Sequence, residues 1–179
     1  MRGPGPDPVA NPSEYQQLLL SLLGDDDPGE VQRTTPGALR QLVADAGARL
    51  TARPAPGEWS VLECVGHITD GELVASGRYR WILAHDRPPL LPYDQDLWVE
   101  RLGHADADPE ELLALFEALR AANLRLWKRT SPEDRARIGL HEERGPESFD
   151  LTFRLAAGHD RLHAQQARRT LELVAATRS

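Results

Sequence analysis

The positions of the fourteen prolines most constrain the fold that this 179-residue chain can adopt. Proline lacks a backbone N–H and its ring clashes with the preceding helical turn, so a helix interior rarely contains it. Four prolines fall within residues 1–12, and residues of apolar character then recur at helical spacing in the proline-free windows 13–27, 37–53, 57–87, 110–131 and 147–179. None of these windows shows the sustained alternation of a strand. The pattern predicts an all-α chain.

Local signals mark where the predicted helices begin. Ser60 can cap a first turn while Glu63 reaches back to the Ser60 amide, and Trp59 and Cys64 occupy the two positions of a hydrophobic staple. A second start lies at Asp108, which precedes a proline and two glutamates. We therefore expect four main helices over roughly 37–52, 58–84, 109–129 and 148–175, with a short leading helix over 13–23.

A long connection separates the second and third of these main helices. It reads HDRPPLLPYDQDLWVERLGHADA, and its prolines at 88, 89 and 92 prevent a continuous helix, although residues 94–102 can add a turn or two. Such a length suits a crossover within a four-helix bundle. Because 179 residues suffice for one domain and are few for two, we predict a disordered leader over 1–12 and a single domain over 13–179.

Charge and composition disfavour several classes of protein. The chain carries 21 Lys and Arg against 28 Asp and Glu, and its arginines are scattered, so a polyanion such as DNA would be repelled. No apolar run approaches the roughly 20 residues of a membrane span, and the first residues lack the apolar region of a secretory signal. The single cysteine, Cys64, fits a reducing compartment. We therefore predict a cytoplasmic protein that binds neither nucleic acid nor membrane.

Two of the six histidines, His159 and His163, lie four residues apart in the segment GHDRLH. Residues at this spacing project from one helical face about one turn apart, which suits two bonds to one metal. His67, on the helix expected over 58–84, can bring a third imidazole to the same point. Three histidines leave a fourth position open, as in catalytic zinc sites. A hydrogen-bonded pair of core or surface histidines is the alternative interpretation.

Five segments carry a resemblance to a known family: PGEWSVLECVGHITDGE, DRPPL, DQDLW, RIGLHEERG and AAGHDRLHAQQ. In this order and spacing, from about residue 36 to residue 170, they resemble the DinB-like superfamily, in particular its branch named for metal-dependent hydrolases. The resemblance implies a four-helix bundle of up-down-down-up topology. It also implies that His67, His159 and His163 hold a divalent metal, commonly nickel or zinc. Relatives with a known activity are mostly transferases or isomerases that use a small cellular thiol.

Three further residues are candidates for binding a substrate. Arg78 shares a side of its helix with His67, Arg120 matches an arginine of the family's third helix, and His141 matches a histidine common in relatives. A guanidinium can bind a carboxylate in a two-pronged manner. A salt bridge for either arginine, and a loop-stabilising role for His141, are equally compatible with the sequence.

Several other side chains receive structural assignments. Buried metal-binding histidines normally need an acceptor on their other nitrogen, and helical spacing positions Asp70 and Gln166 for this role. Cys64 is expected to be a small buried hydrophobe rather than a ligand or a redox thiol. We expect packing roles for the four tryptophans, and solvated positions for His85 and His104.

These features predict a metalloenzyme in which the metal activates a small thiol or a water toward a small-molecule substrate, by thiol transfer or by hydrolysis. The chain has no Ser-His-Asp or Cys-His signature, so no side chain is assigned as nucleophile or general base. A non-catalytic stress-response protein that binds a metal or a small ligand is one alternative, and a purely structural bundle is another. Homodimerisation through the outer helix faces is compatible with the sequence.

Overall fold

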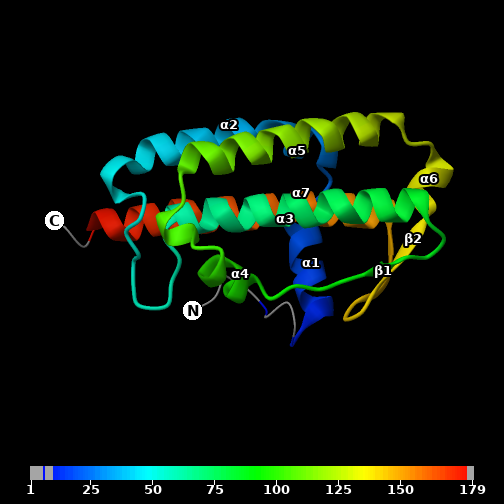
Figure 1. Ribbon diagram of the computed structural model, residues 1–179, viewed down its shortest axis with the longest axis horizontal. Coiled ribbons are helices and arrows are strands. Elements are labelled where there is room, and N and C mark those ends of the chain that lie inside the picture. Colours follow the sequence, from blue (N-terminus) through cyan, green and yellow to red (C-terminus); the bar gives the residue numbers. More distant parts are fainter. Residues whose placement is uncertain (1–5, 7–9, 177–179) are drawn as a thin grey trace.

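Four long helices form two layers in the computed structural model, which describes residue 6 and residues 10–176 (Figure 1). The first layer holds α2 (Pro28–Ala46) and α5 (Pro109–Arg129), and the second holds α3 (Val61–Ala84) and α7 (Phe149–Ala176). The chain runs in one direction along α3 and α5 and in the opposite direction along α2 and α7. The predicted four-helix bundle with up-down-down-up topology is confirmed.

The short leading helix, α1 (Pro12–Leu23), crosses the long helices on the side of the α3–α7 layer that faces away from α2 and α5 (Figure 1). A Cβ atom at Gly158 would lie 2.1 Å from the carbonyl oxygen of Leu19, so α1 can approach α7 this closely only where α7 has glycine. The predicted leader over 1–12 lies largely outside the described residues.

The boundary predicted for the first main helix is wrong. We expected it to begin at residue 37, after Pro36, whereas α2 begins at Pro28 with Asp27 as its cap and contains Pro36 in its interior. A proline at this position removes the N–H that would bond to the carbonyl oxygen of Gln32, four residues earlier. Arg120 on α5 donates to that oxygen instead, at 2.9 Å. This bond from another helix satisfies the carbonyl that Pro36 leaves unpaired.

The other long helices begin and end close to the predicted residues. The capping box at Ser60 and Glu63 is present, so α3 begins at Val61. The crossover after α3 contains the short helix α4 (Gln95–Arg101) and a single 3₁₀ turn, η2 (His104–Asp106), before α5 begins at the predicted Pro109. Two further short elements, η1 (Gly47–Arg49) and α6 (Pro132–Ala136), follow α2 and α5 respectively.

A small three-stranded sheet lies at one end of the bundle, where the sequence patterns predicted no strand. It joins β1 (Pro89–Leu90) of the crossover to the hairpin of β2 (Ile138–His141) and β3 (Gly145–Ser148), with β1 parallel and β3 antiparallel to β2. Strands of two to four residues are too short for alternation to be recognised. The sheet brings the crossover and the hairpin together beside α3 and α7.

The core fills the space between the two helix layers. Its largest cluster includes Leu39, Val65, Ile68 and Phe116, and Cys64 lies in it as the buried hydrophobe that we expected. None of the described helices combines the length and the hydropathy that a membrane span needs. On the side away from this core, α1, the crossover and the hairpin cover the outer face of the α3–α7 layer.

Candidate metal centre

Three imidazoles from two helices converge on one point of the α3–α7 layer. The Nε2 atom of His67 lies 2.9 Å from Nε2 of His159 and 3.2 Å from Nε2 of His163. One ligand atom from each ring lies within 4.8 Å of the other two. His67 and His163 are buried, while His159 is partly exposed. The sequence placed these rings on converging faces, and the structure brings them into contact.

Small residues and packing contacts hold the rings in place. Gly71, one turn beyond His67 on α3, lies beneath the His159 ring, and a Cβ atom there would be 3.0 Å from His159 Cε1. Trp59 packs against His67 with ring centroids 4.9 Å apart. Because Trp59 directly precedes the helix cap, the well-specified start of α3 also positions a wall of the histidine cluster.

Burial keeps the three rings neutral. Desolvation lowers the pKa of His67 and His163 well below the ordinary value, and it lowers the pKa of His159 to about 4. The charges of Arg120 and Arg78 lower the His159 pKa further. Neutral imidazole is the form that binds metals, because the donor nitrogen needs a free lone pair.

The hydrogen bonding of His163 points its Nε2 lone pair at the other rings. The Nδ1 atom of His163 lies 2.8 Å from Oε1 of Gln166, an acceptor, so Nδ1 carries the proton and Nε2 does not. This is the acceptor role expected for Gln166. By contrast, Nδ1 of His67 is buried without a hydrogen-bond partner in the described part of the chain.

The donor set fits a divalent transition metal. Three nitrogens that each bind zinc at 2.0–2.1 Å in tetrahedral geometry lie about 3.3 Å apart. The 2.9 and 3.2 Å from His67 Nε2 to the other two Nε2 atoms are close to this value. Imidazole suits zinc, nickel, copper and iron. Three protein ligands leave one position for a water or a substrate atom. His159 and His163 both line a cavity.

That cavity has a volume of about 630 Å³ and lies along the groove between α3 and α7. The α7 face that carries the histidines supplies one long wall, and Tyr15, Gln16 and Leu19 of α1 supply another. Residues of the crossover close a third side, including Tyr93, whose ring centroid is 6.5 Å from that of His67. The sequence did not predict the contribution of α1, because no local pattern in residues 12–23 indicates which distant helix this segment crosses.

Comparisons with known proteins identify the family of this chain. The model of the DinB superfamily matches residues 31–167, about three-quarters of the chain. The chain belongs to the DinB superfamily. It is 29% identical over 107 residues to a protein of Oceanobacillus iheyensis named "Putative metal-dependent hydrolase", covering 60% of this chain and 62% of that protein. It is 30% identical over 91 residues to YfiT of Bacillus subtilis, which bears the same description, covering 50% of this chain and 51% of YfiT.

The solved structure of YfiT has the same fold as this DinB-superfamily chain. The two superpose with a TM-score of 0.74 over 92% of this chain and 87% of YfiT, at 21% sequence identity. That structure is described as a "probable metal-dependent hydrolase with an unusual four-helix bundle topology". At this level of identity, the likeness shows the fold alone.

Of the predicted substrate-binding residues, Arg78 and His141 line the cavity. The Arg78 Nη2 atom donates to the carbonyl oxygen of Leu91 at 2.7 Å and lies 3.2 Å from Nε2 of His141. Arg78 is only 9% exposed, and its Nε atom has no hydrogen-bond partner among the described residues. The two residues thus meet at the hairpin end of the cavity, away from the histidine cluster.

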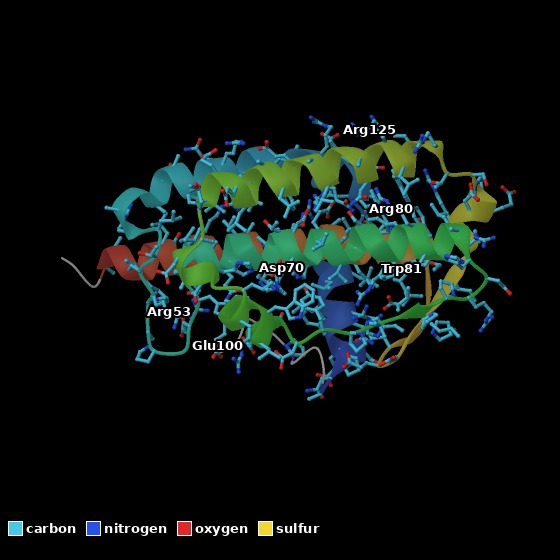
Figure 2. All side chains as sticks on the ribbon, viewed as in Figure 1. Arg53, Asp70, Arg80, Trp81, Glu100 and Arg125 are labelled. Atoms are coloured by element: carbon cyan, nitrogen blue, oxygen red, sulfur yellow. The ribbon has the colours of Figure 1, made fainter. Side chains whose placement is uncertain are left out.

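Arg120 lies between the helix layers instead of lining the cavity. It is 1% exposed and binds Asp160 on α7 at 2.6 Å and Glu72 on α3 at 2.9 Å. Arg80 extends the polar network by reaching from α3 toward α5, where it donates to Asn123 at 3.0 Å (Figure 2). Of the two roles considered for Arg120, the structure favours the salt bridge, although its partners lie on helices rather than in a loop.

The expectations for His104 in the crossover and for Asp70 on α3 are both wrong. His104 is 4% exposed rather than solvated, and its Nε2 lies 2.6 Å from Oδ2 of Asp70. Asp70, labelled on α3 in Figure 2, therefore binds a crossover residue and not a histidine of the cluster. A Cβ atom at Gly66 would lie 2.4 Å from the His104 ring, so the glycine of CVGHITD makes room for this contact.

The predicted packing role of the tryptophans holds for three of the four. Trp59 is buried, Trp127 stacks on Phe153 with centroids 4.0 Å apart, and Trp98 packs against Tyr93 at 4.6 Å. Trp81 is 45% exposed and lies across Gly77 on the outer side of α3. Its spacing from His67 had placed it on the buried side, and this is wrong for Trp81, whereas Tyr79 and Ile82 of the same turn are buried.

Proposed function

We propose that this protein is a metal-dependent enzyme that binds nickel or zinc through His67, His159 and His163 and acts on a small molecule in the adjoining cavity. The convergence of three neutral imidazoles beside a cavity of about 630 Å³ carries the proposal. Structural metal sites are closed by four protein ligands, whereas three ligands and an adjoining cavity are typical of catalytic sites. The names of the Oceanobacillus iheyensis relative and of YfiT, both described as metal-dependent hydrolases, support the same assignment.

The proposed reaction is transfer of a small cellular thiol to an electrophile, with hydrolysis as the second possibility for the same site. A metal bound there would act as a Lewis acid that lowers the pKa of a thiol or water in its open position. The chain itself would hold the three rings neutral, orient His163 through Gln166, and exclude bulk water with α1 and the crossover. None of the described residues at the cluster supplies a serine or cysteine nucleophile, since Cys64 lies in the hydrophobic core.

A turnover assay tests the proposal directly. The full-length protein, loaded with nickel or zinc, would be incubated with low-molecular-weight thiols and electrophiles such as activated aryl halides and epoxides. We expect thiol consumption that requires metal and is abolished by His163→Ala. His85→Ala, which alters an exposed histidine outside the cluster, serves as the matched control and should keep the wild-type rate.

The outcomes separate the predicted alternatives. Hydrolysis of esters or amides without thiol consumption would assign the hydrolase activity. A stoichiometric metal with no turnover across the panel would contradict the enzymatic proposal and favour a non-catalytic metal-binding protein. A chain that binds no metal would contradict both.

A further inference from the structure

The hairpin end of the cavity holds more hydrogen-bond donors than acceptors. Arg78 offers only donors, and its Nε atom is buried without a partner. The Nε2 atom of His141 faces Arg78 Nη2 at 3.2 Å, while Nδ1 of the same ring faces the backbone N–H of Glu143 at 3.2 Å. A neutral imidazole has one N–H and one lone pair, so it can accept only one of these two bonds. At least one donor at this end is therefore left without an acceptor.

The carboxylates nearby do not bind Arg78 directly, although the charge of Glu147 acts on it. Among the described residues, no carboxylate forms an ion pair with Arg78, although the chain has more acidic than basic residues. Glu147 is the acidic residue of the adjoining strand, and Arg144 already binds both of its oxygens, at 2.5 and 3.0 Å. Gln16 of α1 donates to Glu147 as well, at 2.7 Å. Glu147 is thus occupied by Arg144 and Gln16, and Arg78 is left without a carboxylate in hydrogen-bonding contact among the described residues.

A buried guanidinium without a carboxylate partner lowers the stability of the folded protein unless a ligand binds it. Burial and the charge of Arg144 lower the pKa of Arg78, and burial with the same arginines lowers the pKa of His141 to about 4. These shifts indicate that the protein alone does not stabilise positive charge at this position. A ligand that only accepts hydrogen bonds and carries negative charge would satisfy the free donors.

We propose that Arg78 and His141 form a carboxylate-binding subsite at the hairpin end of the cavity. His67 and Arg78 are eleven residues apart on α3, which corresponds to about 16 Å along the helix axis. Val74, Ala75 and Leu155 line the stretch between them. The substrate class is therefore a small molecule with an apolar body and a carboxylate at the end remote from the reacting group. Only the placement of the reacting group at the histidine cluster rests on the proposed function.

The carboxylate can belong to the electrophile or to the thiol, and a binding experiment distinguishes the two. Calorimetric titration of the full-length, metal-loaded protein would compare 4-phenylbutyrate with its neutral amide, and N-acetylcysteine with its neutral amide. We expect the acid of at least one pair to bind about ten-fold or more tightly than its amide, since hydrogen bonds to charged groups have this magnitude. The pair that shows the preference identifies the source of the carboxylate.

Variants locate the subsite. Arg78→Gln should remove the preference for the acid, whereas Arg169→Gln should keep it, because Arg169 lines the cavity but lies on α7 beyond the histidine cluster. Equal binding of acid and amide by the wild-type protein would overturn the proposal, as would a preference that survives Arg78→Gln or disappears in Arg169→Gln.

A second measurement covers the case in which Arg78→Gln does not fold. In the wild-type protein, the Nε–H resonance of Arg78 should shift on titration with the preferred acid and stay in place with its amide; an unmoved resonance would overturn the subsite. Elemental analysis of the same samples separates this proposal from the proposed function. An acid preference in protein that binds no metal would contradict the metalloenzyme alone, and a bound metal without acid preference would contradict the subsite alone.

Discussion

Arg120 on α5 donates a hydrogen bond of 2.9 Å to the carbonyl oxygen of Gln32 on α2, the acceptor that loses its helical partner at Pro36. The same guanidinium binds Glu72 on α3 and Asp160 on α7. One buried side chain therefore contacts all three of the other long helices. Asp160 directly follows His159 in the sequence, so the same network also fixes the position of the His159 turn of α7 along α3.

Replacement of Arg120 by methionine should destabilise the protein severely. The variant would remove the positive charge that pairs with two buried carboxylates, which would keep only the neutral hydrogen bonds from Asn123 and Thr35, and it would leave the carbonyl oxygen of Gln32 unpaired. Breaking a buried ion pair from one side costs about 3–5 kcal/mol. Urea denaturation followed by circular dichroism measures the loss. Arg40→Met is the matched control, since Arg40 pairs with Glu110 and Glu117 on the surface, and its effect should be far smaller. Equal stability of the two variants would show that the buried network does not hold the bundle.

Loss of the Gln166 side chain should weaken metal binding while leaving the fold intact. Gln166 accepts the Nδ1 proton of His163 and so directs Nε2 toward the cluster. Removing such a partner typically costs about ten- to a hundred-fold in metal affinity. Competition titration against a chromogenic chelator would give the dissociation constants of Gln166→Ala and of Gln165→Ala, an exposed neighbour. The first should bind more weakly and the second should equal the wild type; identical constants would contradict the role of Gln166.

A methyl group at Gly71 should also reduce metal affinity. Its Cβ atom would lie 3.0 Å from Cε1 of His159, so the ring must move away from the other two imidazoles. Gly37→Ala provides the control, because no atom lies within 4 Å of a Cβ at that exposed helical position. We expect a several-fold loss of affinity for Gly71→Ala and none for Gly37→Ala. Unchanged affinity in both variants would show that the ring does not depend on the glycine.

The metal-free protein should lose stability as the pH falls from 7 to 5.5. The histidines of the cluster and His141 have pKa values below the ordinary value of about 6.5 because they are buried. Between pH 6.5 and about 4, the unfolded chain binds protons that the folded protein does not, so acid favours unfolding. His141 and His159 should each contribute a loss of about 1 kcal/mol between pH 7 and 5.5. Denaturation midpoints that stay constant over this range would contradict the assignment, and His141→Gln should reduce the dependence.

Local signals predicted a helix start correctly where a capping residue directly precedes a run of residues with helical periodicity. The Ser60–Glu63 capping box and the Asp108–Pro109 start lie at the observed ends of α3 and α5. The spacing of four residues correctly predicted that His159 and His163 share one face of α7, and both line the cavity. Helical periodicity and capping depend on a few neighbouring residues, so both can be recognised in a single sequence.

Features that depend on distant partners could not be predicted in this way. Pro36 argues against a helix interior unless Arg120, 84 residues later, is known to satisfy the free carbonyl. No local feature around His104 predicts its hydrogen bond to Asp70. The unpaired Nε–H of Arg78 likewise cannot be predicted without the positions of all the acceptors around it. In each case the deciding interaction joins two elements whose packing is set by the whole fold.

Elemental analysis of protein purified without a histidine tag tests the central claim most directly. We predict about one nickel or zinc ion per chain after reconstitution at neutral pH, and its loss in His159→Ala, with His85→Ala retaining the wild-type content. A wild-type protein that holds no divalent metal after reconstitution, or a His159→Ala variant that keeps a full equivalent, would contradict a metal centre built from His67, His159 and His163.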